Sequence, residues 1–267
     1  MKRSTHIMLI LLGAVALTVL VVAANIARSH SQTSGLKIKI DYDHQPTLVD
    51  SKVVTDSILR LMPDLLQQQV RNVDLKAVSR AASTVPFLEH CDASMSVGGH
   101  IVVKASQRHP VARVFAAGRE FYIDRHGRAM PQSSLGEINA IVASGNITDR
   151  IDTLLYDRLD IAVLAADSAT ANLGIVDIWK TACYLDANPN YGCLFDQIFL
   201  NAAGDVVLTP KLGDHIVVLG KSDNLDNKFA RLQLFYIKVM PKSGWDAYSR
   251  LNLKFDNQVV CTRRGKQ

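Results

Sequence analysis

The sequence predicts an α+β protein: one N-terminal transmembrane helix, then a small βααββ module and a larger mixed β domain with flanking helices. Three observations support this fold class. Residues 7–27 are almost entirely apolar, residues 36–106 show the periodicities of a strand, two helices and two strands, and residues 107–262 alternate strands with helices. Hydrophobic residues make up 48% of the 267 residues and charged residues 21%, which is typical of a folded chain.

The membrane anchor is predicted from residues 7–27, which carry no formal charge. As a helix this segment spans about 30 Å, the thickness of a hydrocarbon core. Lys2 and Arg3 precede it and only Arg28 follows closely, so the positive-inside rule makes residues 1–6 a cytoplasmic tail and places the rest on the periplasmic side of the inner membrane. A signal peptide cleaved after Ala24 is the alternative, but the apolar run exceeds the about 7–15 residues of a signal core.

The net charge of +5 does not indicate nucleic-acid binding. The sequence between the two ends of the chain is formally neutral. The net charge comes from five positive residues at the ends: Lys2, Arg3, Arg263, Arg264 and Lys266. A neutral body lacks the basic face that phosphate binding requires.

The first module is predicted to follow a polar spacer, residues 28–35. Residues 36–42 alternate apolar and polar side chains, which is typical of a half-buried strand. Asp50 can cap a first helix, and Asn72 or Asp74 a second. Two further alternating segments flank Gly98-Gly99, as in a β-hairpin.

The second module begins near Gln107 and is richer in strands. We expect helices over residues 148–185 and 227–240, because apolar residues recur there at helical spacing. Short alternating or apolar runs bounded by turn residues predict strands at 111–115, 121–123, 138–144, 195–201, 206–210, 215–219 and, as a C-terminal pair or one bent strand, 248–255 and 258–262.

No catalytic motif is present in the sequence. It contains no GxSxG, HExxH, Walker or GxGxxG pattern, its eight histidines are scattered, and its three glutamates form no close pair. Asp41-Tyr42-Asp43-His44 superficially resembles a metal-ligand set, but a turn at a strand end explains it better. We therefore predict no catalytic residue, metal or cofactor. Cys183 and Cys193 are close enough in sequence to form a disulfide, although four free thiols, with Cys91 and Cys261, are equally compatible.

The order of these segments resembles the FtsQ/DivIB family of bacterial cell-division proteins. Gln107–Ala112 (QRHPVA) is similar to the QR-x-P segment that closes the family's first module, and residues 121–131 are similar to the hairpin that follows. Residues 228–260 are similar to its C-terminal helix and strands. The resemblance covers about residues 1–262 and is strongest to members of the Bacteroidetes type.

The resemblance implies a non-enzymatic scaffold at the division septum. Residues 36–106 would form a POTRA-like domain, residues 107–262 the β domain, and residues 263–267 a basic tail. In this family a late strand of the β domain binds FtsB- and FtsL-like coiled-coil proteins, and so connects with the septal peptidoglycan synthesis complex.

Our candidate binding site is the edge of the last strand, where unpaired backbone groups can accept a partner strand. The candidate residues are Tyr248, Leu251, Leu253, Lys254, Phe255, Asn257, Gln258, Val259 and Val260. Alternatively they are ordinary core residues, since about half of any strand faces inward.

Two other functions compete with the scaffold. POTRA modules also serve envelope assembly and secretion, although a lone module with no following barrel sequence fits that task poorly. An anchored cell-wall hydrolase is the third possibility, and it would need a nucleophile–base pair or a metal cluster that the sequence does not display.

Overall fold

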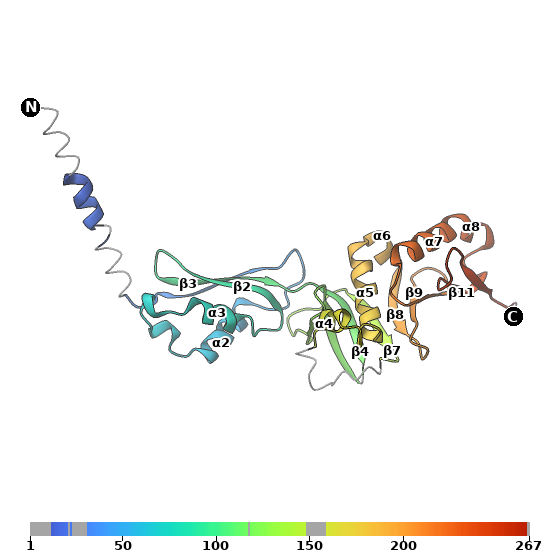
Figure 1. The fold of residues 1–267 in the computed structure, drawn as a ribbon, viewed down its shortest axis with the longest axis horizontal. Coiled ribbons are helices and arrows are strands. Elements are labelled where there is room, and N and C mark those ends of the chain that lie inside the picture. The colour runs from blue at the N-terminus through green and yellow to red at the C-terminus, as the bar shows by residue number, and fades with distance from the viewer. Residues whose placement is uncertain (1–11, 21, 23–30, 117, 148–158, 266–267) are drawn as a thin grey trace, which may run out of the picture. The chain divides into compact units, whose positions relative to one another are not determined.

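The computed structural model describes residues 12–20, 22, 31–116, 118–147 and 159–265. It confirms the α+β class (Figure 1). The chain divides into two compact units, an N-terminal unit that ends at Gln107 and a C-terminal unit that begins at Arg108. Each unit has a sheet and a hydrophobic core of its own.

The predicted anchor is only partly described. Residues 12–20 form an exposed helix, whereas residues 7–11, 21 and 23–27 lie outside the described part of the chain. Among the described residues, no helix is both long enough and apolar enough to cross a membrane.

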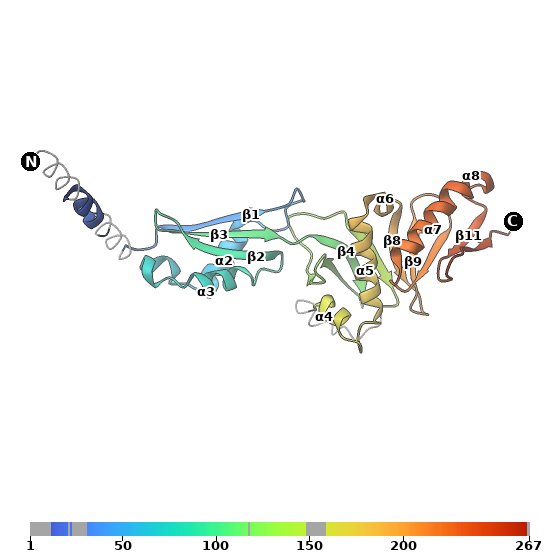
Figure 2. The same cartoon turned by 45° about the horizontal axis from the view of Figure 1, so that its top comes forward.

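The N-terminal unit is a three-stranded sheet with two helices on one face (Figures 1 and 2). Its sheet order is β1-β3-β2, with β1 parallel and β2 antiparallel to β3. The elements are β1 (Gly35–Asp41), α2 (Ser51–Leu61), the 3-10 helices η1 (Leu65–Gln67) and η2 (Val70–Asn72), α3 (Leu75–Ala82), β2 (Leu88–Met95) and β3 (His100–Gln107).

Local sequence explains where these helices begin. The Asp50 side chain accepts a hydrogen bond from the Val53 N–H, and Asp74 accepts one from the Ala77 N–H, so each carboxylate satisfies a donor that the first helical turn leaves unpaired. Of the two caps that the sequence allowed for the second helix, the structure uses Asp74. Apolar side chains of both helices then pack on those of the strands.

The C-terminal unit is a nine-stranded sheet of order β12-β11-β10-β9-β8-β7-β4-β5-β6. Its strands are β4 (Pro110–Ala116), β5 (Arg119–Asp124), β6 (Ala129–Met130), β7 (Ile141–Gly145), β8 (Phe195–Leu200), β9 (Val206–Pro210), β10 (Ile216–Gly220), β11 (Tyr248–Asn252) and β12 (Val260–Arg263). Its helices are α4 (Ile161–Ala166), α5 (Gly174–Ala187), α6 (Pro189–Gly192), α7 (Leu225–Lys238) and α8 (Met240–Ser243).

Two crossovers explain why α5 and α7 lie on the same face of this sheet (Figure 2). β7 pairs in parallel with β8, and β10 in parallel with β11, so each pair needs a long connection, which the helices supply. The starting strands β7 and β10 run in the same direction, because β7 is parallel to β8 while β8, β9 and β10 alternate in direction. Each connection also leads to the neighbouring strand on the β12 side of its starting strand. Crossovers are almost always right-handed, and this puts both helices on one side.

The largest departure from the sequence prediction is the segment expected to be helical over residues 148–185. The structure has two separate helices here, α4 and α5, with Asp167–Leu173 in turns; residues 148–158 lie outside the described ranges. Asp167 explains the break, because its side chain and its carbonyl accept hydrogen bonds from the next residues of the chain, including the N–H groups of Ala169 and Thr170.

The Gln107-Arg108 pair has a structural role in each unit. In the N-terminal unit, the Gln107 side chain accepts from the Leu48 N–H at 2.7 Å and donates to the Pro46 carbonyl at 3.0 Å. In the C-terminal unit, Arg108 pairs at 2.7 Å with the fully buried carboxylate of Asp124.

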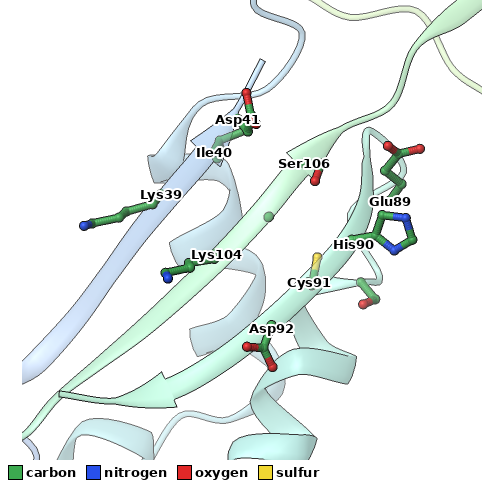
Figure 3. Close-up of a pocket in the computed structure, with 11 residues that line it drawn as sticks. Lys39, Ile40, Asp41, Glu89, His90, Cys91, Asp92, Lys104 and Ser106 are labelled. Atoms are coloured by element: carbon green, nitrogen blue, oxygen red, sulfur yellow. The ribbon is translucent and has the colours of Figure 1, made fainter. Parts of the chain in front are cut away.

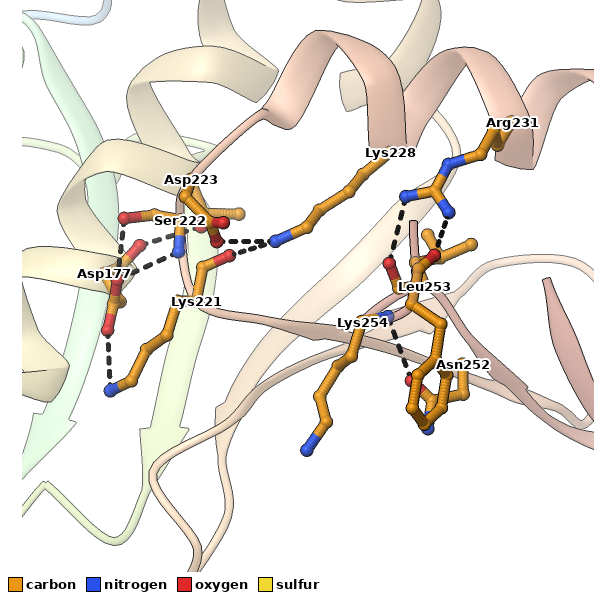
Figure 4. A network of polar contacts seen from close by, with 11 residues as sticks. Asp177, Lys221, Ser222, Asp223, Lys228, Arg231, Asn252, Leu253 and Lys254 are labelled. Carbon is orange, nitrogen blue, oxygen red and sulfur yellow. Dashed lines mark hydrogen bonds and ion pairs between the residues drawn. The ribbon is translucent and has the colours of Figure 1, made fainter. Parts of the chain in front are cut away.

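A buried polar network fixes the start of α7 (Figure 4). Asp177 of α5, only 5% exposed, accepts hydrogen bonds from the Ser222 N–H at 2.9 Å, the Ser222 hydroxyl at 2.7 Å and Lys221 Nζ at 3.1 Å. Lys228 of α7, equally buried, donates to the Lys221 carbonyl at 2.8 Å and to Asp223 at 2.7 Å. The β10–α7 connection is thereby tied to both crossover helices.

We predict that Asp177→Asn lowers the free energy of unfolding by about 1–3 kcal/mol, because the amide nitrogen cannot accept and leaves buried donors unpaired. Urea unfolding followed by tryptophan fluorescence measures this unit, since Trp179 and Trp245 both lie in it. Asp196→Asn is the matched control: its carboxylate is 63% exposed and 3.9 Å from Lys211. Equal effects of the two substitutions would contradict the prediction.

Candidate functional site

β12 is the terminal strand of the nine-stranded sheet and pairs with β11 alone among the strands that the structure describes. Its pairing partners run from Asn252, opposite Val260, to Tyr248, opposite Arg263. The sequence prediction of a C-terminal strand pair is therefore the correct one of the two alternatives, and the strand continues to Arg263, into the predicted tail.

Backbone alternation identifies which groups face away from the sheet. The Arg264 N–H donates to the Ala247 carbonyl, and the Leu253 N–H donates to Val218 of β10. Since successive residues of a strand direct their N–H groups to opposite sides, the N–H and C=O of Thr262 face β11, whereas those of Cys261 and Arg263 face outward. This outward row is the β12 edge.

Arg231 of α7 holds the loop that precedes β12 (Figure 4). Its guanidinium donates to three backbone carbonyls, those of Leu253 at 3.1 Å, of Gln258 at 2.8 Å, and of Phe255. A planar guanidinium with several fixed donors suits such a fan of acceptors, which a single ammonium cannot reproduce.

The other end of β12 is held by Arg264. Its guanidinium donates to the Asp214 carboxylate at 3.0 Å and to the Asp214 carbonyl at 2.9 Å. β12 is thus restrained at both of its ends, while its outward backbone groups stay free of strand partners in the described chain. Restraint of this kind reduces the conformational entropy lost when a partner strand binds.

The predicted site residues separate into two groups. Leu251 and Leu253 are fully buried in the core, and Tyr248 is half-buried with its ring edge-on to Phe235 at 5.5 Å. Val259 packs against the same core. Their side chains support the strand from within.

The remaining predicted residues lie at the surface. Phe255 is 45% and Val260 43% exposed, and Asn257 has a left-handed backbone conformation in the connecting turn. Gln258 contributes its carbonyl to Arg231. Lys254 does not project freely, because its Nζ pairs with Asp205 at 2.8 Å and its stem lies against Gly220.

A cleft of about 490 Å³ adjoins this end of β12. Its lining includes the two arginines at the end of the strand, Arg263 and Arg264. The other lining residues are Ser243, Asp246, Ala247, Tyr248 and Gly265. The cleft is open to solvent and has more positive than negative side chains, so it suits an acidic or polar side chain next to the edge.

A larger cleft, about 910 Å³, lies in the N-terminal unit, at the end of its sheet where β1 and β3 finish and β2 begins (Figure 3). Lys39 and Lys104 are direct cross-strand neighbours there, and Asp92 is the next residue in the row. Its lining has mixed charge and is open, with Glu89 and His90 at one side. Within the described residues, no group of three or more histidine, cysteine or acidic side chains could hold a metal ion.

An aromatic cluster supports the sheet beneath the edge. His215, 1% exposed, has its Nε2 2.8 Å from the Tyr236 hydroxyl, and the Trp245 ring lies tilted against both rings. Burial, and secondly the nearby Arg264, lower the pKa of His215, with Asp214 opposing them.

All four cysteines are free thiols. Burial raises the pKa of Cys183 to about 12, aided by Asp186 and Asp124, so its thiol is poorly reactive. Burial likewise raises the pKa of Cys261, whose side chain packs against the core while its backbone faces outward.

Sequence reasoning missed Arg231 and Asp214. A lone arginine on a helix and an aspartate before a strand are ordinary surface residues by pattern, and only the fold brings them to β12. The periodicity of residues 248–255 did indicate the strand, but not that Leu253 lies beyond its end in the core.

We predict that Arg231→Lys accelerates amide hydrogen exchange in the peptide covering residues 253–263, because one ammonium cannot bind three divergent carbonyls. Exchange measured by mass spectrometry checks this. Arg250→Lys, an exposed arginine of β11, is the control and leaves exchange there unchanged; similar protection in both variants would refute the role of Arg231.

We also predict that His215 makes the protein less stable in acid. With its folded pKa below the about 6.5 of an unfolded histidine, the unfolded state binds more protons as the pH falls through that window, and stability is lost there, by at most about 1.4 kcal/mol per pH unit. The variant His215→Gln lacks this dependence. Urea midpoints measured from pH 7.5 down to about pH 5 for both proteins provide the comparison, and parallel curves would rule the effect out.

Comparison with known proteins agrees with the family resemblance. A family model described as FtsQ/DivIB, C-terminal related, matches residues 109–262, more than half of the chain and nearly all of the C-terminal unit. No curated protein matches the chain. By this match, the chain belongs to the FtsQ/DivIB family of cell-division proteins.

Proposed function

We propose that this protein is a non-enzymatic, membrane-anchored scaffold of the bacterial division machinery, and that it binds FtsB- and FtsL-like partners by pairing a partner strand with the β12 edge. The family supports the division role. The observation that carries the binding mode is the outward row of β12, with the backbone groups of Cys261 and Arg263 free of a strand partner in the described sheet.

The proposed topology follows from the sequence. Residues 7–27 form a single-pass inner-membrane anchor with a cytoplasmic N-terminus, the POTRA-like domain and the β domain lie in the periplasm, and the protein gathers at the septum near the peptidoglycan synthesis complex. Partners that also span the membrane are then confined to the same surface, which raises their effective concentration.

Side chains beside the edge would add specificity. Val260 and Phe255 offer exposed apolar surface at the start of the strand, and Arg263 lines the cleft at its end. We infer a partner segment with an apolar side chain near Val260 and an acidic one near Arg263, because complementary charge guides and orients association.

Proline substitutions test the edge directly. Cys261→Pro removes an outward N–H and is expected to weaken partner binding about tenfold, with little loss of monomer stability. Thr262→Pro removes an N–H that faces β11 and is expected to destabilise the sheet itself. Affinity is measured with the purified full-length chain in detergent and the coiled-coil partner, and stability by urea unfolding.

Cys261→Ala is the matched control, because it keeps the backbone donor and alters only the partly buried thiol. It should bind as the parent protein does. Unchanged affinity of Cys261→Pro would exclude strand addition at β12, whereas equal destabilisation by both prolines would show that the strand has no free edge.

A further inference from the structure

The N-terminal residues of the N-terminal unit are bound tightly to one end of it. The Thr33 N–H and hydroxyl both donate to the Gln68 carbonyl at 3.0 Å. Ser34 donates from its N–H to the Gly99 carbonyl at 2.9 Å and from its hydroxyl to the Gly98 carbonyl at 2.8 Å. These contacts join the chain to the η1–η2 segment and to the β2–β3 hairpin turn.

Chain length places this end of the unit close to the proposed anchor. Three residues, 28–30, separate the end of the apolar segment at Ala27 from Ser31, whose carbonyl accepts from the Val70 N–H at 3.0 Å. Even a fully extended chain spans at most about 3.6 Å per residue. Ser31 therefore lies within about 15 Å of the end of the apolar segment.

Exposed apolar side chains gather at the same end. Val97, at the tip of the hairpin, is 83% exposed, more than any other large apolar side chain that the structure describes. Leu66 of η1 is 36% exposed, and Val70 lies beside the hairpin glycines. In Figures 1 and 2 this hairpin tip and the 3-10 segment lie at the end of the unit where residue 31 enters the fold.

These segments are also depleted in charge. Residues 31–36, 65–72 and 96–100 contain a single formally charged residue, Arg71, although 21% of the chain is charged. The nearest acid in sequence, Asp64, precedes the 3-10 segment. A surface with polar amides, exposed aliphatic side chains and little charge can lie against lipid headgroups with a small desolvation cost.

We infer that this end of the N-terminal unit is a membrane-contact surface, in which Val97 and Leu66 lie in the headgroup region of the bilayer that holds the anchor. The inference rests on the anchor part of the proposed function. Contact at two points beside the tether restricts how the unit tilts on the membrane, which a flexible spacer alone does not do.

Tryptophan substitution tests the contact. Full-length Val97→Trp and Leu66→Trp are reconstituted into vesicles of brominated phosphatidylcholine with phosphatidylglycerol, and the emission added relative to the parent protein is measured. Bromine quenches only nearby indoles, so we expect loss of the added emission for both variants. Val53→Trp is the control. Val53 is also an exposed valine, 46%, but it lies in the first turn of α2, about 12 Å along the helix from the Leu61 end that leads into η1.

Each outcome decides the inference. Quenching of Val97→Trp and Leu66→Trp but not of Val53→Trp supports it. If all three emissions are unquenched although the protein stays bound to the vesicles after an alkaline wash, the inference is overturned while the anchor stands. Release of the chain by alkaline washing overturns it together with the anchor. None of these results bears on the β12 edge, so failure here and failure of partner binding remain distinguishable.

Discussion

The C-terminal unit depends on the hydrogen bonds that the buried carboxylate of Asp177 accepts. This carboxylate joins the first crossover helix, α5, to the loop that leads into the second, α7, through Ser222 and Lys221. Lys228 then ties the first turn of α7 to the same loop. Because a helix is rigid over one turn, fixing its start also fixes where Arg231 points, three residues later.

Arg231 transfers that order to the edge of the sheet. The carbonyls that it binds belong to the loop between β11 and β12, and the Arg264–Asp214 pair restrains the opposite end. A terminal strand with few neighbours would otherwise fray, since only one ladder holds it. The polar network in the interior and the exposed binding edge are therefore successive parts of one arrangement.

An exposed strand edge is also a risk, because it can pair with any other free edge. β12 limits this risk by being only four residues long, by carrying charge at Arg263, and by pairing with a strand that has an irregular register between Tyr248 and Arg250. A short edge gives few backbone hydrogen bonds and hence modest intrinsic affinity. Selectivity must then come from flanking side chains and from confinement of both partners to one membrane.

The sequence predicted those parts of this arrangement that depend on local pattern. Alternation identified strands such as β1, apolar runs beside turn residues identified others such as β9, and short acidic side chains marked the helix starts at Asp50 and Asp74. All of these effects act within a few residues. It could not separate Leu253, which lies in the core, from Phe255, which is exposed, since alternation ends where the strand does. Nor could it pair Arg231 with carbonyls over 20 residues away, or Asp214 with Arg264, because such contacts exist only once the crossovers have brought these segments together.

The same limit explains why the edge itself is recognised only from the fold. The segment 258–262 has the composition of any amphipathic strand, and nothing in it states whether one neighbour or two will pair with it. Its position follows from the two crossovers, each of which adds a strand on the same side and leaves the last hairpin outermost. The candidate binding site is thus a consequence of chain topology, which is why its backbone groups, more than its side chains, define what can bind there.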